Sequence, residues 1–235
     1  MEKEKVNYTS MFWLFMFGSV AGFLIEGIWC VIRSGRWENH SATLWGPFCI
    51  IYGFGAVLVY LLALFVKKRS LLLQFVVYTL AGGSVEYFGS LFQEVFFGSV
   101  SWDYSDHFFN IDGRVSLKMA LIWGVLGIAL SYLVLPYARH LLEMMRGRFW
   151  HMLCLGLSLF MVVNLMITSL AVSRWQSREE STHPLIWWID ETYDDETMLE
   201  HFPNMHWMQK PHHKVRLTFD FHSFDQMIIA EHDDS

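Results

Sequence analysis

Three glutamates lie within segments that are otherwise apolar enough to cross a membrane. Glu26 lies in the first of these segments, and Glu86 and Glu94 lie in the third. A carboxylate in the hydrocarbon core costs about 2.5 kcal/mol or more, so each should face a polar interior, be paired, or be protonated. Such residues can bind a proton or a cationic group, or act as a general acid or base.

The spacing of these acids shows which helix faces carry them. Gly82, Glu86, Ser90 and Glu94 recur every four residues, so one face of the third segment is polar for three turns. Eight residues at 1.5 Å per residue separate the two glutamates by about 12 Å, so they need partners from elsewhere. In the first segment Gly18, Gly22 and Glu26 are also spaced by four residues. This spacing predicts a face on which the two glycines allow close packing of another helix, with Glu26 at the end of that face.

The segment after the third apolar run supplies candidate partners for the two glutamates. Arg114 is the charged candidate, and an acid, an amide and two interfacial aromatic residues precede it: Trp102, Asp103, Tyr104 and Asn110. These types could furnish a polar pocket at the membrane surface. Alternatively, Asp103 caps a turn and the aromatic residues mark the interface. The predicted binding site comprises Glu26, Glu86, Ser90, Glu94, Trp102, Asp103, Tyr104, Asn110 and Arg114, and we assign no catalytic residue, metal ligand or cofactor.

The composition identifies the elements that must position these residues. Hydrophobic residues make up 54% of the chain and charged residues 17%, with 11 Trp and 20 Phe, which is typical of an integral membrane protein. Because a spanning helix needs about 20 apolar residues, we predict an all-α bundle of five transmembrane helices. Their expected ranges are 8–32, 47–66, 71–98, 118–138 and 149–172. The first is expected to be retained, because it is too long for a signal peptide and lacks a cleavage pattern.

The distribution of Lys and Arg predicts the orientation in the membrane. Eight of them fall beside the N-terminus and the loops on its side, and six fall on the opposite side. The positive-inside rule therefore predicts a cytoplasmic N-terminus and an extracytoplasmic C-terminal tail. The loops 33–46 and 99–117 would share the outer face with that tail. A clustered basic face is absent from the sequence, which argues against nucleic-acid binding.

The sequence divides into a transmembrane domain, 1–172, and an acidic tail subdomain, 173–235. The tail holds five Lys or Arg against thirteen Asp or Glu, a net charge of −8. It is expected to contain a short acidic helix over 193–200 and a strand over 215–222, where apolar and polar residues alternate. A second strand over 227–230 would complete a β-hairpin. We expect the hairpin to pack on the outer loops or on another subunit.

Several motifs together resemble one family of bacterial multi-pass membrane proteins. They are Pro-Phe-x-x-Ile-Tyr-Gly-x-Gly at 47–55, Gly-x-x-x-Glu-Tyr at 82–87, Trp-Asp-Tyr-Ser at 102–105, Gly113-Arg114, Trp123-Gly124 and Phe-Pro-Asn-Met at 202–205. Over roughly residues 11–208 the chain is similar to the family catalogued as putative ABC-transporter type IV, or CmpB-like permeases. The resemblance implies a permease subunit. The sequence contains no Gly-x-x-x-x-Gly-Lys-Ser/Thr phosphate loop, so an ATPase would be a separate subunit.

Three classes of function remain open at this point. In a transporter component, the glutamates would line a hydrated path and Arg114 would hold an anionic part of the solute. In a membrane enzyme acting on a lipid-like or phosphate-bearing substrate at the outer face, one glutamate would be the general acid or base. In a scaffold, the polar stripe would pair helices. The expected partners are membrane lipids, a separate ATPase subunit docked on 139–148, or further copies of the chain.

Overall fold

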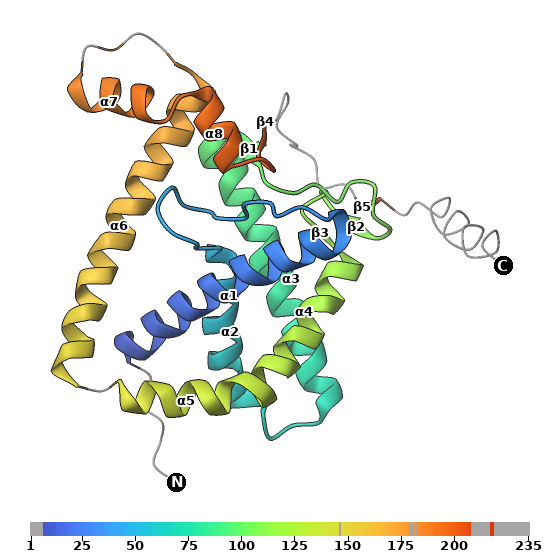
Figure 1. The fold of residues 1–235 in the computed structure, drawn as a ribbon. Coiled ribbons are helices and arrows are strands. Elements are labelled where there is room, and N and C mark those ends of the chain that lie inside the picture. Colours follow the sequence, from blue (N-terminus) through green and yellow to red (C-terminus); the bar gives the residue numbers. More distant parts are fainter. Residues whose placement is uncertain (1–6, 146, 179–180, 182, 208–216, 219–235) are drawn as a thin grey trace. The chain divides into compact units, whose positions relative to one another are not determined.

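The computed structural model describes residues 7–145, 147–178, 181, 183–207 and 217–218, and most of them are helical (Figure 1). Four helical segments are long and apolar enough to cross a membrane: Tyr8–Ser34, Leu71–Phe97, Leu117–Met144 and Arg148–Gln176. A fifth apolar helix, α2 (Ile50–Val66), has 17 residues, about 25 Å at 1.5 Å per residue, which is the lower end of the spanning range. The predicted all-α fold with five apolar helices is confirmed.

The fourth apolar segment is longer than the sequence predicted. It consists of α4 (Leu117–Ala129), a π-helical turn at Leu130–Val134, and α5 (Leu135–Met144). Pro136 lies in the first turn of α5, and proline has no backbone N–H to donate to the preceding turn. The wider π turn changes the hydrogen-bond register just before this residue, so the helix continues beyond the end expected at residue 138.

The chain forms two compact units. Met1–Leu64 and Leu130–Met205 form the first, and Phe65–Ala129 and His206–Ser235 form the second. The separate tail domain expected from residue 173 onward stays a prediction.

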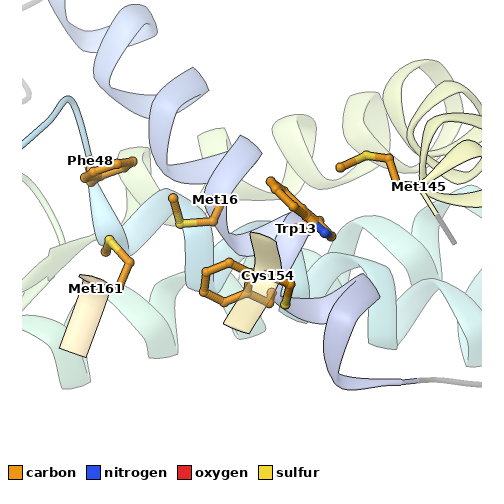
Figure 2. Packing of buried hydrophobic residues seen from close by; sticks show 7 residues of the cluster. Trp13, Met16, Phe48, Met145, Cys154 and Met161 are labelled. Atoms are coloured by element: carbon orange, nitrogen blue, oxygen red, sulfur yellow. The ribbon is translucent and has the colours of Figure 1, made fainter. Parts of the chain in front are cut away.

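The first unit has an apolar core in which α1 (Tyr8–Ser34) meets α6 (Arg148–Gln176). Figure 2 shows Trp13 and Met16 of α1 near Cys154 and Met161 of α6. Phe12, Phe48 and Met145 belong to the same cluster. Next to this core, α1 packs closely on α2. The Tyr52 ring lies so near Gly22 that a Cβ atom on this residue would be only 2.3 Å from it. The glycine stripe of α1 therefore serves helix packing, as the sequence indicated.

A buried amide holds the loop between α1 and α2 against α6. Asn164 Nδ2 donates to the carbonyl of Trp45 at 2.7 Å, and its Oδ1 accepts from the Trp45 N–H at 3.1 Å. The Trp45 indole donates to Tyr193 at 2.8 Å, and the ring of His201 lies within hydrogen-bond distance of the carbonyl of Thr43. The polar residue inside the apolar helix is thus satisfied by loop backbone.

Two short helices follow α6 in the first unit, α7 (Pro184–Thr192) and α8 (Asp195–His201). The second overlaps the acidic helix expected over 193–200, and its N-cap Asp194 accepts from the N–H of Thr197 at 2.8 Å. Arg174 connects the end of α6 to α7 through two hydrogen bonds to Asp190, of 3.0 and 2.6 Å. Arg178 adds a third contact to this carboxylate at 3.2 Å.

These contacts predict a pH dependence of stability. The hydrogen bonds from Arg174 hold the pKa of Asp190 below its usual range, with the charge of Arg178 assisting. Because the folded pKa is lower than the unfolded value of about 3.9, the stabilisation is present above about pH 4 and is lost as the pH falls through the folded pKa. We expect Asp190→Asn to lower the thermal unfolding midpoint at pH 7, with the difference from wild type shrinking below about pH 4. A difference that stayed constant down to pH 3 would contradict this.

The second unit contains α3 (Leu71–Phe97) and α4, which lie side by side (Figure 1), and five two-residue strands. They are β1 (Ser99–Val100), β2 (Asn110–Ile111), β3 (Val115–Ser116), β4 (His206–Trp207) and β5 (Leu217–Thr218). β1 pairs with β4, and β2 pairs with both β3 and β5, all antiparallel. Residues 217–218, within the strand expected over 215–222, pair with β2 in loop 99–117. The packing of the whole expected hairpin stays a prediction. The strand predicted over 227–230 lies outside the described residues.

Candidate functional site

Eight of the nine predicted site residues lie in the second unit, on α3 and on the segment 99–117. Glu26 lies in the first unit, where the hydroxyl of Tyr52 donates a hydrogen bond to its Oε1. The spacing on α1 correctly indicated an acid next to a helix-packing stripe. The candidate site therefore consists of the eight residues of the second unit.

A tight turn directs Arg114 towards α3. Asp112 and Gly113 both have positive φ, 55° and 66°, and the N–H of Arg114 donates to the carbonyl of Ile111 at 3.0 Å. Two consecutive positive φ angles are typical of a type I′ hairpin turn, for which Asp-Gly is a favoured sequence. Gly113 is also required for space, because a Cβ there would lie 2.5 Å from Asp103 Oδ1. The turn places the arginine between β2 and β3, at the end of the β-hairpin.

Arg114 forms a buried ion pair with Glu94, which is the central feature of the site. Nη2 lies 2.5 Å from Glu94 Oε2, and Nη1 lies 3.4 Å from the hydroxyl of Ser90. Only 4% of Arg114 and 9% of Glu94 is exposed. The guanidinium carbon also lies 5.8 Å from the centre of the Tyr87 ring. A buried charge pair on an apolar helix is expensive to form, so its residues are candidates for function.

The second glutamate of α3 is bound to the same loop. Tyr104 donates from its hydroxyl to Glu86 Oε1 at 2.9 Å, and Glu86 is 4% exposed. The neighbouring Tyr87 donates to Asp112 Oδ2, also at 2.9 Å. Two tyrosine–carboxylate hydrogen bonds therefore connect α3 to the segment 99–117, and the helix residues in them precede Glu94 by seven and eight positions.

The remaining predicted residues maintain the shape of the loop. Trp102 donates through its indole N–H to the carbonyl of Arg114 at 2.9 Å. Asn110 donates to the carbonyls of Ser105 and His107 and accepts from the N–H of Gly113. Asp103 accepts from the N–H of Ser105 at 2.8 Å, which is the turn-capping role that the sequence offered as an alternative. These three residues position the charged groups.

A small cavity of about 10 Å³ adjoins the ion pair. It is lined by Ser90, Glu94, Val100, Trp102, Asp103, Asp112, Gly113 and Arg114. This volume accommodates about one water molecule. As described, the site has room for little more than a water molecule beside the ion pair, so a larger solute needs the loop to move.

Sequence reasoning missed Asp112 and Tyr87 as members of this site. The sequence contains a feature that could have identified each of them. Asp112 begins an Asp-Gly dipeptide between two segments with strand character, which is a strong hairpin indicator, and Tyr87 follows the glutamate of the polar stripe directly. Reading that dipeptide as a turn would have predicted that Arg114 lies at the end of a hairpin next to α3.

Comparison with known proteins gives one match. The model of the family described as "Putative ABC-transporter type IV" matches residues 13–169, about two thirds of the chain. Neither the curated proteins nor the solved structures contain a match. The matched range includes every predicted site residue, most of α1 and α6, and all of the helices between them. With these helices, the match indicates a multi-pass membrane protein concerned with transport.

Proposed function

The chain belongs to the putative ABC-transporter type IV family, and from this premise we propose that it is a permease-like subunit whose second unit binds a polar solute. The observation that carries the proposal is the buried pair of Arg114 with Glu94. Ionisable residues inside membrane helices are costly and commonly mark a solute or ion pathway. Alternatively, the pair of Arg114 with Glu94 only stabilises the fold, in which case the segment 99–117 does not need to open.

In the proposed binding step, an anionic group of the solute replaces Glu94 on Arg114. Arginine presents a planar set of donors that matches a carboxylate or a phosphate, so it can exchange one oxyanion for another. Glu94 then becomes available to take up a proton or a cationic part of the solute. Ser90, which lies 3.4 Å from the guanidinium, would supply a further polar contact on the same face of α3.

The small size of the cavity supports a gated site. Because about 10 Å³ admits roughly one water molecule, a solute can enter only if the segment 99–117 moves away from α3. The Tyr104–Glu86 and Tyr87–Asp112 hydrogen bonds would open in that step. Glu86 is thus proposed to couple the loop to the helix, and its protonation would weaken that connection.

The proposed site opens to the outer face of the membrane. The excess of Lys and Arg on the side of the N-terminus supports a cytoplasmic N-terminus, which with five spans places the segment 99–117 and the tail outside. Protease added to intact spheroplasts should therefore remove an epitope at the C-terminus. An epitope that is cleaved only after the membrane is permeabilised would contradict this orientation.

A separate ATPase is the proposed energy source, with residues 139–148, which include the end of α5, as its docking element. Two hydrophobic side chains of α5, Tyr137 and Met144, are 78% and 67% exposed, although lipid contact would also explain their exposure. The test is affinity purification of the tagged full chain from its native membranes. An ATP-hydrolysing subunit should co-purify with wild type and with Glu86→Gln, while ATP hydrolysis by the complex falls only in the variant.

Glu200→Gln provides the matched control, because Glu200 is an exposed glutamate on α8 in the other unit. It should leave both assembly and ATP hydrolysis unchanged. Absence of any ATP-hydrolysing partner would overturn the proposal. Turnover of a phosphate-bearing lipid by the isolated chain in detergent, lost in Glu86→Gln, would instead establish the enzyme alternative. Loss of assembly in Glu86→Gln would favour a scaffold.

A further inference from the structure

Three side chains with metal-binding atoms meet at the end of α1, in the first unit, and the proposed function uses none of them. Cys30 Sγ lies 3.8 Å from Glu38 Oε2 and 3.8 Å from His40 Nε2, and the three ligand atoms all lie within 4.8 Å of one another. We propose that Cys30, Glu38 and His40 bind a divalent metal ion of the zinc class. Thiolate, imidazole and carboxylate together are a donor set that zinc accepts.

The distances fit a tetrahedral ion without rearrangement of the backbone. With a zinc–sulfur bond of about 2.3 Å and a zinc–nitrogen bond of about 2.0 Å, tetrahedral geometry separates the two ligand atoms by roughly 3.5 Å. The observed separation of 3.8 Å between sulfur and nitrogen is close to this value. Small side-chain adjustments therefore suffice to close the site around an ion.

The charges of the ligands also match that of a divalent metal ion. A thiolate and a carboxylate neutralise a dication, so the occupied site has no net charge at the end of an apolar helix. Binding requires the Cys30 thiol to lose its proton, which passes to solvent. All three residues are half-buried, which leaves a route for the ion and for the proton. All three cysteines of the chain are free thiols, so Cys30 is available as a ligand.

The fold brings the ligands together by reversing the chain after α1. Gly35 ends the helix with φ of 70°, a left-handed conformation that favours glycine. The Trp37 ring then packs where a Cβ on Gly27 would be, at 2.2 Å from the ring, and meets Phe23 edge-on at 5.6 Å. This packing returns Glu38 and His40 to the helix turn that carries Cys30.

The histidine is held with the metal-binding nitrogen directed to the site. Its Nδ1 lies 3.1 Å from the carbonyl of Glu38, an arrangement in which Nδ1–H donates and the lone pair is on Nε2. The amide Nδ2 of Asn204 lies 3.2 Å from the same Nε2. Backbone carbonyls commonly orient metal-binding histidines in this way. A water molecule, or the amide oxygen of Asn204 after rotation of its side chain, would complete the coordination.

The test measures zinc binding by the full-length chain in detergent, purified with a tag that contains no histidine and kept under reducing conditions. Wild type should bind one Zn²⁺ per chain, with a rise in the thermal unfolding midpoint. Cys30→Ser and His40→Ala should each weaken binding by about 100-fold or more, because each removes a direct ligand. Cys49→Ser and His140→Ala are the matched controls and should bind as wild type does.

A second measurement uses the unaltered chain, so that a poorly folded variant does not decide the outcome. Zn²⁺ should slow maleimide labelling of Cys30, measured on the isolated peptide by mass spectrometry, and leave labelling of Cys49 unchanged. Equal protection of both cysteines, or equal zinc affinity in wild type and Cys30→Ser, would overturn the proposal. Neither readout depends on transport or on an ATPase, so failure here is distinct from failure of the proposed function.

Discussion

Arg114→Met is expected to lower the free energy of unfolding by about 3–5 kcal/mol, the largest effect predicted for any single change in this chain. Arg114 is 4% exposed and contacts both Glu94 and Ser90. Removing the cation leaves the Glu94 carboxylate buried without its counter-charge. This carboxylate must then either take up a proton or remain charged in a poorly solvated position, and both lower the stability of the folded state. Denaturation in detergent mixed with increasing sodium dodecyl sulfate measures the loss.

A double variant separates charge from packing. Replacing both members, as in Glu94→Leu with Arg114→Met, should recover most of the stability lost in the single variant, because apolar groups of similar size can replace a buried pair. Arg36→Met is the control, since Arg36 is exposed and its loss should cost well under about 1 kcal/mol. A double variant as unstable as Arg114→Met alone would show that hydrogen bonds to the loop, rather than the charge pair, stabilise the site.

Gly82→Ala is expected to destabilise the second unit by about 1–3 kcal/mol through overpacking. A Cβ on Gly82 would lie 2.3 Å from the Cβ of Trp123 and 2.5 Å from its Cγ, so α3 and α4 would have to separate. The clash involves the base of the tryptophan side chain, which cannot rotate away. The unfolding midpoint in detergent should fall accordingly, and the polar face of α3 that begins at Glu86 should shift with its helix.

The adjacent residue provides an unusually close control. Gly83→Ala would place its Cβ 3.5 Å from Ala120 and 3.6 Å from Val115, which are ordinary contact distances. Since alanine also favours the helix by about 1 kcal/mol relative to glycine, this variant should be neutral or slightly stabilising. Equal effects of the two substitutions would mean that helix propensity, rather than the contact of α3 with α4, determines the result.

The membrane helices were predictable because their signal is local. In lipid every backbone polar group must be satisfied within the segment, so an apolar run of sufficient length is itself the evidence for a helix. The ranges predicted for the first three helices, 8–32, 47–66 and 71–98, agree with α1, α2 and α3 to within three residues at each end. The fourth was predicted to end at residue 138, where the apolar run meets Arg139, whereas the helical segment continues through α5 to Met144.

The polar face of α3 was also a local property, whereas its partners were not. The four-residue spacing placed Glu86, Ser90 and Glu94 on one face, and the structure finds all three buried. Which glutamate Arg114 would reach depends on the Asp-Gly turn and on where the hairpin lies along α3. The position of the hairpin along α3 is set by contacts between residues about 20 positions apart in the sequence.

The membrane class, the apolar helices, the family and the residue types able to bind charge could be predicted without a structure. Hydropathy and helical periodicity depend only on the order of neighbouring residues. Tertiary structure alone decided that Arg114 neutralises Glu94, that Glu26 contacts Tyr52, and that Cys30 meets Glu38 and His40. Each of these pairings requires the chain to turn back on itself. The direction of such a turn is set by packing, such as Trp37 against Gly27, which periodicity does not encode.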